Sequence, residues 1–382
     1  MLDASFLRAS EAACLQWDVP ALAVGVSVGG RAETAAVGAC EPDTIFRVAS
    51  ITKPFTALLG LQLLGLEDTT GVWPDDVRVR HLLSHMSGFD CELSGGRDLS
   101  LFGDGDDALA REAAELPHVR RFVGVEQVWS YANTGYWLAG HLCAAAAGTT
   151  YEEAIAARIV APLGLDATSF GEPTLAGTGP EVESLGYPRA RRPSGGLVSN
   201  VRDLLRFGAL VMTEPRLRIV LGKPVRGVYG LGLAGERVGG TEVWGHGGSY
   251  GGFQSSLLTI PEHDAVFVGL TNSSFGAKAL YDLENEFFRR VVGAERDVPP
   301  TVDLPEEARD AFSGQYANSD GWYEVAPAVD GVVATFDDGE YAARAIGDRT
   351  FEIVEGNRVR ERFDFPLEGF ARFGSRLAER IA

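Results

Sequence analysis

The tetrapeptide Ser50-Ile51-Thr52-Lys53 constrains how this chain can fold. Only three of its 34 basic residues are lysine, yet one of these lysines stands three positions after a serine. Arginine cannot give up its proton in a protein, whereas a desolvated lysine can. Residues three apart are neighbours on a helix, so the pattern predicts a helical turn that presents a nucleophile beside its base. The alternative is a helix-capping serine followed by a surface lysine.

The residues around this tetrapeptide predict a helix over 46–66, entered near Ser50. Pro54 supports that start, because proline fits a first helical turn whose N–H groups have no partner anyway. The same proline disfavours the helical conformation of Lys53, so the first turn is expected to be tight or partly 3₁₀.

Composition indicates a chain of 382 residues with a large core, since 45% of the residues are hydrophobic. The net charge of −19 argues against nucleic acid or an anionic membrane as partner, and its simplest role is solubility. The first residues lack the basic stretch followed by an apolar run that is typical of a signal peptide. No apolar run reaches membrane-spanning length. A cytoplasmic protein is therefore expected, with reduced cysteines at Cys14, Cys40, Cys91 and Cys143.

The order of expected elements points to an α+β fold. Strands are expected over 21–28, 32–37, 243–244, 253–260 and 265–271, and a helix over 277–292. Residues 78–170 are mainly helical in pattern, and another helix is expected within 195–211, capped by Ser199. These elements fit a sheet assembled from both ends of the main domain, residues 1–296, with helices inserted between. A proline-rich linker over 297–305 then leads to a small β-rich domain, barrel- or sheet-like, over 306–382.

Two further motifs carry chemistry, Tyr131-Ala-Asn133 and His246-Gly-Gly248. A phenol can relay a proton if nearby cations lower its pKa, and an amide can hold both a lysine and a substrate carbonyl. Glycines let a strand edge approach a substrate, so that a backbone N–H can join an oxyanion hole. Each motif alone is explained as well by a core aromatic, a turn amide or a loop histidine. Their order along the chain, after the serine and lysine, favours catalysis.

In that order the chain resembles the serine β-lactamase and penicillin-binding superfamily, in the branch of class C-like esterases and D-aminopeptidases with Y-x-N and H-x-G motifs. The resemblance covers about residues 18–293. It includes the segments Phe46–Ala57, His81–Phe89, Pro162–Phe170, Gly195–Ser199 and Tyr229–Gly232. It implies a five-stranded antiparallel sheet flanked by helices, an all-helical region, and an active site between them.

The resemblance also implies the role of each site residue. Ser50 corresponds to the nucleophile, Lys53 to the base and Tyr131 to a second general acid–base. The substrate-binding and oxyanion group comprises Asn133, His246, Gly248 and Ser249, with the N–H groups of Ser50 and Ser249 forming the oxyanion hole. No cofactor or metal is implied.

The expected function is therefore a serine hydrolase that forms an acyl-enzyme at Ser50 on small esters or amides, including D-amino-acid peptides. The alternatives are an acyltransferase on the same scaffold, a weak β-lactamase or DD-peptidase-like enzyme, and a non-catalytic binding protein. His246-Gly247 stands where β-lactamases usually carry a lysine and a hydroxyl residue, so efficient β-lactam hydrolysis is not expected. Gly247–Gly251 matches the G-x-S-x-G nucleophile elbow, but a strand rather than a helix is expected to follow it. His81 and His85 are interpreted as structural.

Overall fold

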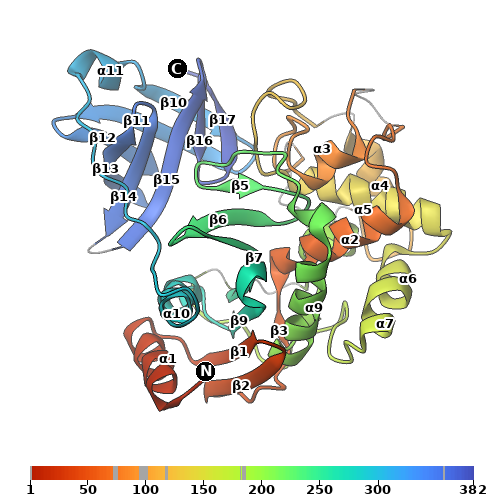
Figure 1. Ribbon diagram of the computed structural model, residues 1–382. Helices are drawn as coiled ribbons and strands as arrows, with labels where there is room; N and C mark the ends of the chain where they lie inside the picture. The colour runs from red at the N-terminus through yellow and green to blue at the C-terminus, as the bar shows by residue number, and fades with distance from the viewer. Residues whose placement is uncertain are drawn as a thin grey trace.

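The computed structural model describes residues 2–71, 76–93, 102–116, 119–180, 182, 186–355 and 358–382. Figure 1 shows three adjoining parts, which are a central sheet, a helical region and a C-terminal barrel drawn in blue. In the described residues, no helix has both the length and the apolar character that crossing a bilayer requires.

The central sheet is antiparallel throughout, in the order β2-β1-β9-β8-β7-β6-β5. Its strands are β1 (Ala21–Val28), β2 (Arg31–Gly38), β5 (Val228–Tyr229), β6 (Ala234–Val238), β7 (Thr241–Tyr250), β8 (Phe253–Ile260) and β9 (Ala265–Thr271). The pairing of β1 with β9 joins the two ends of the main domain, for example at Val24 and Gly269. The α+β class and the sheet built from both ends are confirmed, and β5 and β6 extend the expected sheet at one edge.

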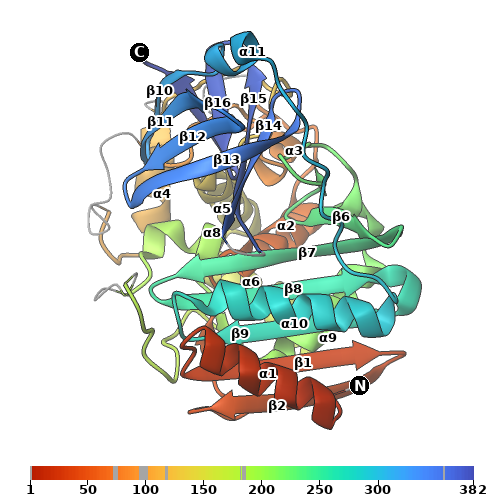
Figure 2. The same cartoon turned by 90° about the vertical axis from the view of Figure 1, so that its left-hand side faces the viewer.

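Helices cover both faces of this sheet. Figure 2 shows α1 (Ala4–Gln16) and α10 (Gly276–Val291) side by side on one face, with α9 (Val201–Thr213) behind. The expected cap of α9 is wrong by one residue. Asn200 is the N-cap and accepts a hydrogen bond from the Asp203 amide, whereas Ser199 ends the short strand β4 (Val198–Ser199).

The predicted helix over 46–66 is shorter than expected. Its first two residues form β3 (Phe46–Arg47), which pairs with β4, and a 3₁₀ turn, η1 (Ala49–Ile51), then leads into α2 (Thr52–Leu63). The Val48 amide donates to the Leu197 carbonyl, so the backbone is anchored just before the turn. The expected 3₁₀ start is thereby confirmed.

The remaining helical elements lie mostly around α2. They are α3 (Val79–Leu83), α4 (Ala108–Glu115), α5 (Asn133–Ala147), α6 (Tyr151–Ile155), a π-helical turn η3 (Ala156–Val160), α7 (Ala161–Leu163), η4 (Arg189–Arg191), α8 (Arg192–Gly195), η5 (Pro215–Arg218) and η6 (Pro261–His263). The α2 helix is buried on nearly all sides between this region and the sheet.

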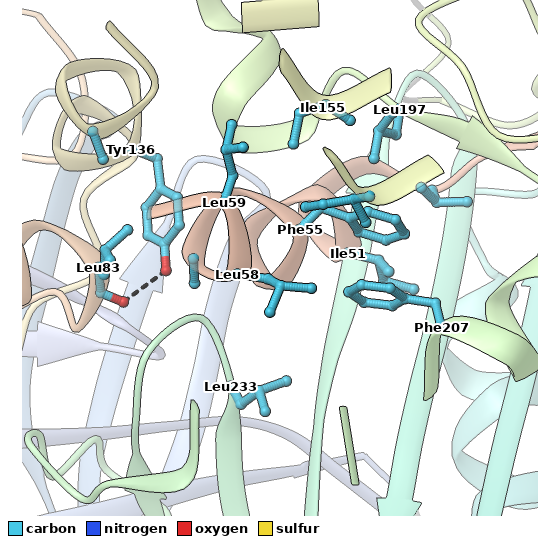
Figure 3. Packing of buried hydrophobic residues seen from close by; sticks show 14 of the residues in the cluster. Ile51, Phe55, Leu58, Leu59, Leu83, Tyr136, Ile155, Leu197, Phe207 and Leu233 are labelled. Carbon is cyan, nitrogen blue, oxygen red and sulfur yellow. Dashed lines mark hydrogen bonds between the residues drawn. The ribbon is translucent and has the colours of Figure 1, made fainter. Parts of the chain in front are cut away.

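Close packing holds α2 in place. The rings of Phe55 and Phe207 stack with centroids 3.5 Å apart and planes 8° from parallel, which joins α2 to α9 (Figure 3). On the side toward α3, the Tyr136 hydroxyl donates to the Leu83 carbonyl at 2.6 Å. The stack therefore anchors the first turn of α2 to α9, and the Tyr136 hydrogen bond joins α5 to α3 beside it.

The C-terminal part is a closed eight-stranded antiparallel barrel preceded by the short helix α11 (Glu306–Asp310). Its strands are β10 (Gly314–Asn318), β11 (Gly321–Ala328), β12 (Gly331–Phe336), β13 (Gly339–Gly347), β14 (Thr350–Glu355), β15 (Arg358–Leu367), β16 (Phe370–Phe373) and β17 (Arg376–Arg380). Aromatic rings fill its interior, with Phe351, Phe363 and Phe373 in stacked contact. Closure pairs β10 with β17, so the first and last strands of the barrel are neighbours.

Replacing Phe207 by alanine should destabilise the protein by roughly 3–5 kcal/mol, because the change removes a fully buried ring and leaves a cavity against Phe55. Denaturant unfolding monitored by circular dichroism measures this loss. Phe275→Ala is the control, since that ring is 42% exposed and its removal should change stability by less than about 1 kcal/mol. Equal losses in the two variants would contradict this account of the core.

Candidate active site

Ser50 lies in η1, at the entrance to α2. The preceding residue, Ala49, has φ of 44°, a left-handed conformation that costs a residue with a Cβ about 1–2 kcal/mol. The surroundings hold this turn, because the Ser255 hydroxyl donates to the Val48 carbonyl at 2.8 Å and the Ile51 amide donates to the same carbonyl at 3.1 Å. The geometry therefore places the Ser50 hydroxyl at the N-terminal start of a helix, where the helix dipole favours an anion.

Lys53 is completely buried, and its ammonium nitrogen is surrounded by acceptors. Nζ lies 3.1 Å from Ser50 Oγ, 2.8 Å from Asn133 Oδ1 and 2.7 Å from the Ser194 carbonyl oxygen. An ammonium can donate to all three. After loss of one proton, two N–H bonds remain for Asn133 and Ser194, and the lone pair is directed at the Ser50 hydroxyl.

Burial lowers the pKa of Lys53 to about 7. The nearby Cys91 and Glu92 oppose this shift, and the positive charge of Arg376 adds to it. An amine with a pKa near neutrality is present in both protonation states at physiological pH, as a general base requires. The environment thus provides the deprotonation that the sequence motif needs.

Tyr131 completes the contacts of Ser50, since its hydroxyl donates to Ser50 Oγ at 2.9 Å. Nearby cations do not lower its pKa overall, so the condition for a proton relay that the sequence suggested is not met in that form. Burial raises the pKa of Tyr131 well above its ordinary value, although the hydrogen bond to Ser50 and the charge of Arg376 act in the opposite direction. The phenol is therefore protonated in the resting state, which suits a proton donor.

Asn133, the first residue of α5, is oriented by a carboxylate. Its Nδ2 donates to Glu92 Oε1 at 2.7 Å, which leaves Oδ1 facing Lys53. The barrel holds Glu92 in turn, because the Glu92 backbone amide donates a hydrogen bond to the Ser319 hydroxyl at 3.0 Å. A chain of hydrogen bonds thus runs from the barrel through Glu92 to the lysine.

The third motif lies on β7, beside η1. A Cβ built on Gly248 would come 3.0 Å from the Ser50 amide nitrogen and 2.3 Å from the Val48 carbonyl oxygen, so only glycine fits there. Ser249 follows, and its hydroxyl accepts a hydrogen bond from the side-chain Nε2 of Gln254 at 2.8 Å. Because β7 turns directly into β8 after Tyr250, the G-x-S-x-G match has no helix behind it and is not an elbow.

His246 is not a fixed cation. Nε2 lies 3.1 Å from the Tyr229 hydroxyl, and Nδ1 lies 2.5 Å from the Gly247 carbonyl oxygen. Burial and the charge of Lys53 hold its pKa well below the usual range of histidine. A neutral imidazole offers a hydrogen bond here but no positive charge for a carboxylate.

All seven residues expected from the sequence lie in or beside one cavity of about 790 Å³. Its lining includes Ser50, Tyr131, Asn133, His246, Gly248 and Ser249, with Lys53 buried behind Ser50. The barrel contributes Ser375 and Arg376 to the same wall. Sheet, helical region and barrel therefore meet at the site.

Several residues of the site were not found from the sequence. The Ser194 carbonyl and the Glu92 carboxylate lie far along the chain from the motifs that they support, and neither residue type is distinctive there. Ser194 directly precedes the family-like segment Gly195–Ser199, and that position was the signal in the sequence that could have placed Ser194 at the site. Nothing in the sequence connects Ser375 and Arg376 with the cavity.

The sheet, the inserted helices and the Ser–Lys–Tyr cluster at their junction define a serine hydrolase of the S-x-x-K class. A sequence profile described as "Beta-lactamase" matches residues 8–288, and the chain belongs to that family. Members of this family are serine hydrolases, so the chain is an enzyme of this kind.

Similar proteins include penicillin-binding protein 4 of Amycolatopsis lactamdurans. It is 26% identical over 352 residues, which cover 76% of this chain and 90% of that protein. A β-lactamase of Lysobacter lactamgenus is 26% identical over 268 residues, covering 60% of this chain and 66% of the relative.

Among solved structures, that of SurE with D-Leu has a TM-score of 0.77 at 22% identity and covers 99% of both chains, so the fold is shared along the whole length. A D-stereospecific amidohydrolase from Streptomyces has a TM-score of 0.58 at 26% identity, covering 72% of this chain and 97% of that one.

Gly248→Ala should lower kcat/KM by about 100-fold or more, because the new methyl group would press on the Val48 carbonyl and displace the Ser50 amide. Steady-state ester hydrolysis measures the effect. Gly247→Ala is the matched control, since its Cβ would meet nothing closer than 3.5 Å, and its loss should stay within a few-fold of wild type. A Gly248→Ala enzyme as active as Gly247→Ala would refute a tight approach of β7 to Ser50.

The buried lysine should make stability depend on pH. Unfolded Lys53 has a pKa of 10.5 and folded Lys53 one of about 7, so between these values the unfolded state binds more protons and stability rises with pH. The free energy of unfolding of wild type, relative to Lys53→Met, should therefore increase by about 2 kcal/mol from pH 7 to pH 9. Urea unfolding of both proteins at each pH tests this, and a pH-independent difference would contradict it.

Proposed function

We propose that this protein is a serine hydrolase that forms an acyl-enzyme at Ser50 on small amides and esters, including those of D-amino acids. One observation carries the proposal. A single hydroxyl lies between the buried amine of Lys53, at 3.1 Å, and the phenol of Tyr131, at 2.9 Å. The similarity to a D-stereospecific amidohydrolase supports the substrate class.

In the acylation step, neutral Lys53 takes the proton of Ser50 as Oγ attacks the carbonyl carbon of the substrate. The negative charge that develops on the carbonyl oxygen is stabilised by the N–H groups of Ser50 and Ser249. As the tetrahedral intermediate collapses, Tyr131 gives its proton to the departing nitrogen or oxygen. The products are a neutral leaving group, protonated Lys53, a Tyr131 phenolate and the Ser50 ester.

Deacylation reverses these roles. Water loses a proton to the phenolate of Tyr131 and attacks the ester carbonyl, and Ser50 leaves with the proton that Lys53 holds. The phenolate is stabilised meanwhile by two cations near the ring, because Lys53 Nζ lies 4.7 Å from its centroid and the Arg376 guanidinium carbon 6.0 Å. The cycle ends with every proton where it began.

A second function, acyl transfer to an amine or alcohol, is favoured by the size of the cavity. A volume of about 790 Å³ falls in the upper part of the range for ligand sites, about 300–1,000 Å³, and leaves room for an acceptor beside the acyl group. Weak β-lactamase activity is the least favoured, because His246 is neutral. Product analysis with added amines separates transfer from hydrolysis.

The test is mass spectrometry of the enzyme after a panel of p-nitrophenyl esters, D- and L-aminoacyl anilides, a penicillin and an active-site phosphonate. Wild type should gain one acyl or phosphonyl group at Ser50, and Ser50→Ala should gain none and lose turnover. Ser249→Ala is the matched control, because it removes a hydroxyl from the same cavity while keeping the backbone N–H. Retained wild-type turnover in Ser50→Ala, or labelling that depends on the Ser249 hydroxyl, would show that the assignment is wrong.

A further inference from the structure

The segment Trp129–Ala132, which carries Tyr131, belongs to no helix or strand. Its backbone groups must therefore find partners outside any regular ladder. The position of the Tyr131 phenol depends on those partners, because α5 begins only at Asn133. Ala132 is extended, and the N–H groups of Ser130 and Ala132 bind on one side of the segment while that of Tyr131 binds on the other.

On one side the segment is bound by His85. The Ser130 amide donates to the His85 carbonyl at 3.1 Å, and the Ala132 amide donates to His85 Nδ1 at 3.0 Å. The imidazole also lies against the Tyr131 ring, with centroids 4.3 Å apart. His85 is itself completely buried, and burial together with the charge of Lys53 holds its pKa well below the usual range, so Nδ1 stays free to accept.

On the other side the same segment is bound by the barrel, at the turn between β16 and β17. The Tyr131 amide donates to the Ser375 carbonyl at 2.8 Å, and the Leu377 amide donates to the Ser130 hydroxyl at 3.0 Å. Arg372 Nη1 donates to the Trp129 carbonyl at 2.9 Å. The segment is thus clamped between His85 and the barrel.

Arg372 is the best-anchored member of the barrel side. Its guanidinium forms a two-point pair with Asp364, through Nε at 2.9 Å and Nη2 at 2.6 Å, and only 4% of the residue is exposed. This pair leaves Nη1 for two carbonyls, those of Trp129 and Lys223, each at 2.9 Å. A planar guanidinium fixed in this way has little freedom to move, so the Trp129 carbonyl is held with it.

We propose that the C-terminal barrel is part of the machinery that positions the proton donor, with Arg372 as its principal positioning residue. The inference rests on the proposed function, in which Tyr131 protonates the leaving group. Arg372 acts through the backbone of Trp129–Tyr131 and not on the substrate. Without it, the phenol loses its alignment with the leaving group, while the Ser50–Lys53 pair within η1 and α2 stays in place.

This division predicts an effect that depends on the leaving group. The nitrogen of an anilide must be protonated to depart, whereas p-nitrophenolate leaves without a proton. The contrast concerns acylation, which kcat/KM reports, because deacylation of the shared acyl-enzyme is the same for both substrates. A misplacement of about 1 Å can cost about 100-fold in rate. Loss of alignment should therefore slow the anilide far more than the ester of the same acyl group.

The experiment compares the p-nitrophenyl ester and the p-nitroanilide of D-phenylalanine, or of whichever acyl donor in the panel labels Ser50. Arg372→Met should lower kcat for the anilide by about 10- to 100-fold with KM changed less than about threefold, and the ratio of ester to anilide kcat/KM should rise at least about fivefold. Arg372→Lys should restore part of the anilide rate, because an ammonium can still donate to the Trp129 carbonyl.

Arg344→Met is the control. Arg344 pairs with Glu352, and Arg372 pairs with Asp364, so each variant removes one arginine–carboxylate pair from the barrel. It should leave the ratio unchanged. If Arg372→Met does not fold, Ser130→Ala decides instead, because it removes only the acceptor of the Leu377 amide and should shift the ratio in the same direction.

Equal losses of kcat/KM on both substrates, or no loss on either, would overturn the inference. The activity of Ser50→Ala distinguishes a failure of this inference from a failure of the proposed function. If Ser50→Ala is inactive and the ratio does not move in Arg372→Met, only the role of the barrel is refuted. If Ser50→Ala is active, the catalytic assignment itself fails.

Discussion

The desolvation of Lys53 is the interaction on which the site depends. An ammonium group is stable in water, and burying it against three neutral acceptors shifts its pKa to about 7. The fold bears the energetic cost of that shift at every pH below the pKa of a free lysine. What it obtains is an amine that can accept the proton of Ser50 without any other base, which is a trade of stability for activity.

Three parts of the chain supply the surroundings that make this burial possible. The η1 turn and α2 present Ser50 and Lys53, α5 begins with Asn133, and β7 closes the cavity from the sheet side. The barrel adds a fourth wall and binds the segment before α5. The cavity thus exists only when parts distant in sequence are packed together, and its electrostatics follow from that packing.

Much of the fold could be predicted from local pattern. Strand alternation and turn residues located β1, β2, β8 and β9, and the proline after Lys53 correctly indicated a 3₁₀ entry to α2. The errors were at element boundaries. Phe46 and Arg47 pair with β4, and Asn200 replaces Ser199 as the cap of α9, because hydrogen bonds to residues far along the chain decide both. Closure of the C-terminal strands into a barrel is likewise a long-range pairing, of β10 with β17.

For the site, the sequence by itself determined which groups were available, namely a hydroxyl, an amine, a phenol and an amide in recognisable motifs. The tertiary structure decided their protonation states. It lowered the pKa of Lys53 as expected, but it raised that of Tyr131, because burial outweighs the nearby cations. It also recruited Glu92, Ser194 and the barrel turn, which no motif marks. Composition and spacing specify the groups, whereas desolvation and orientation arise only when distant segments pack around them.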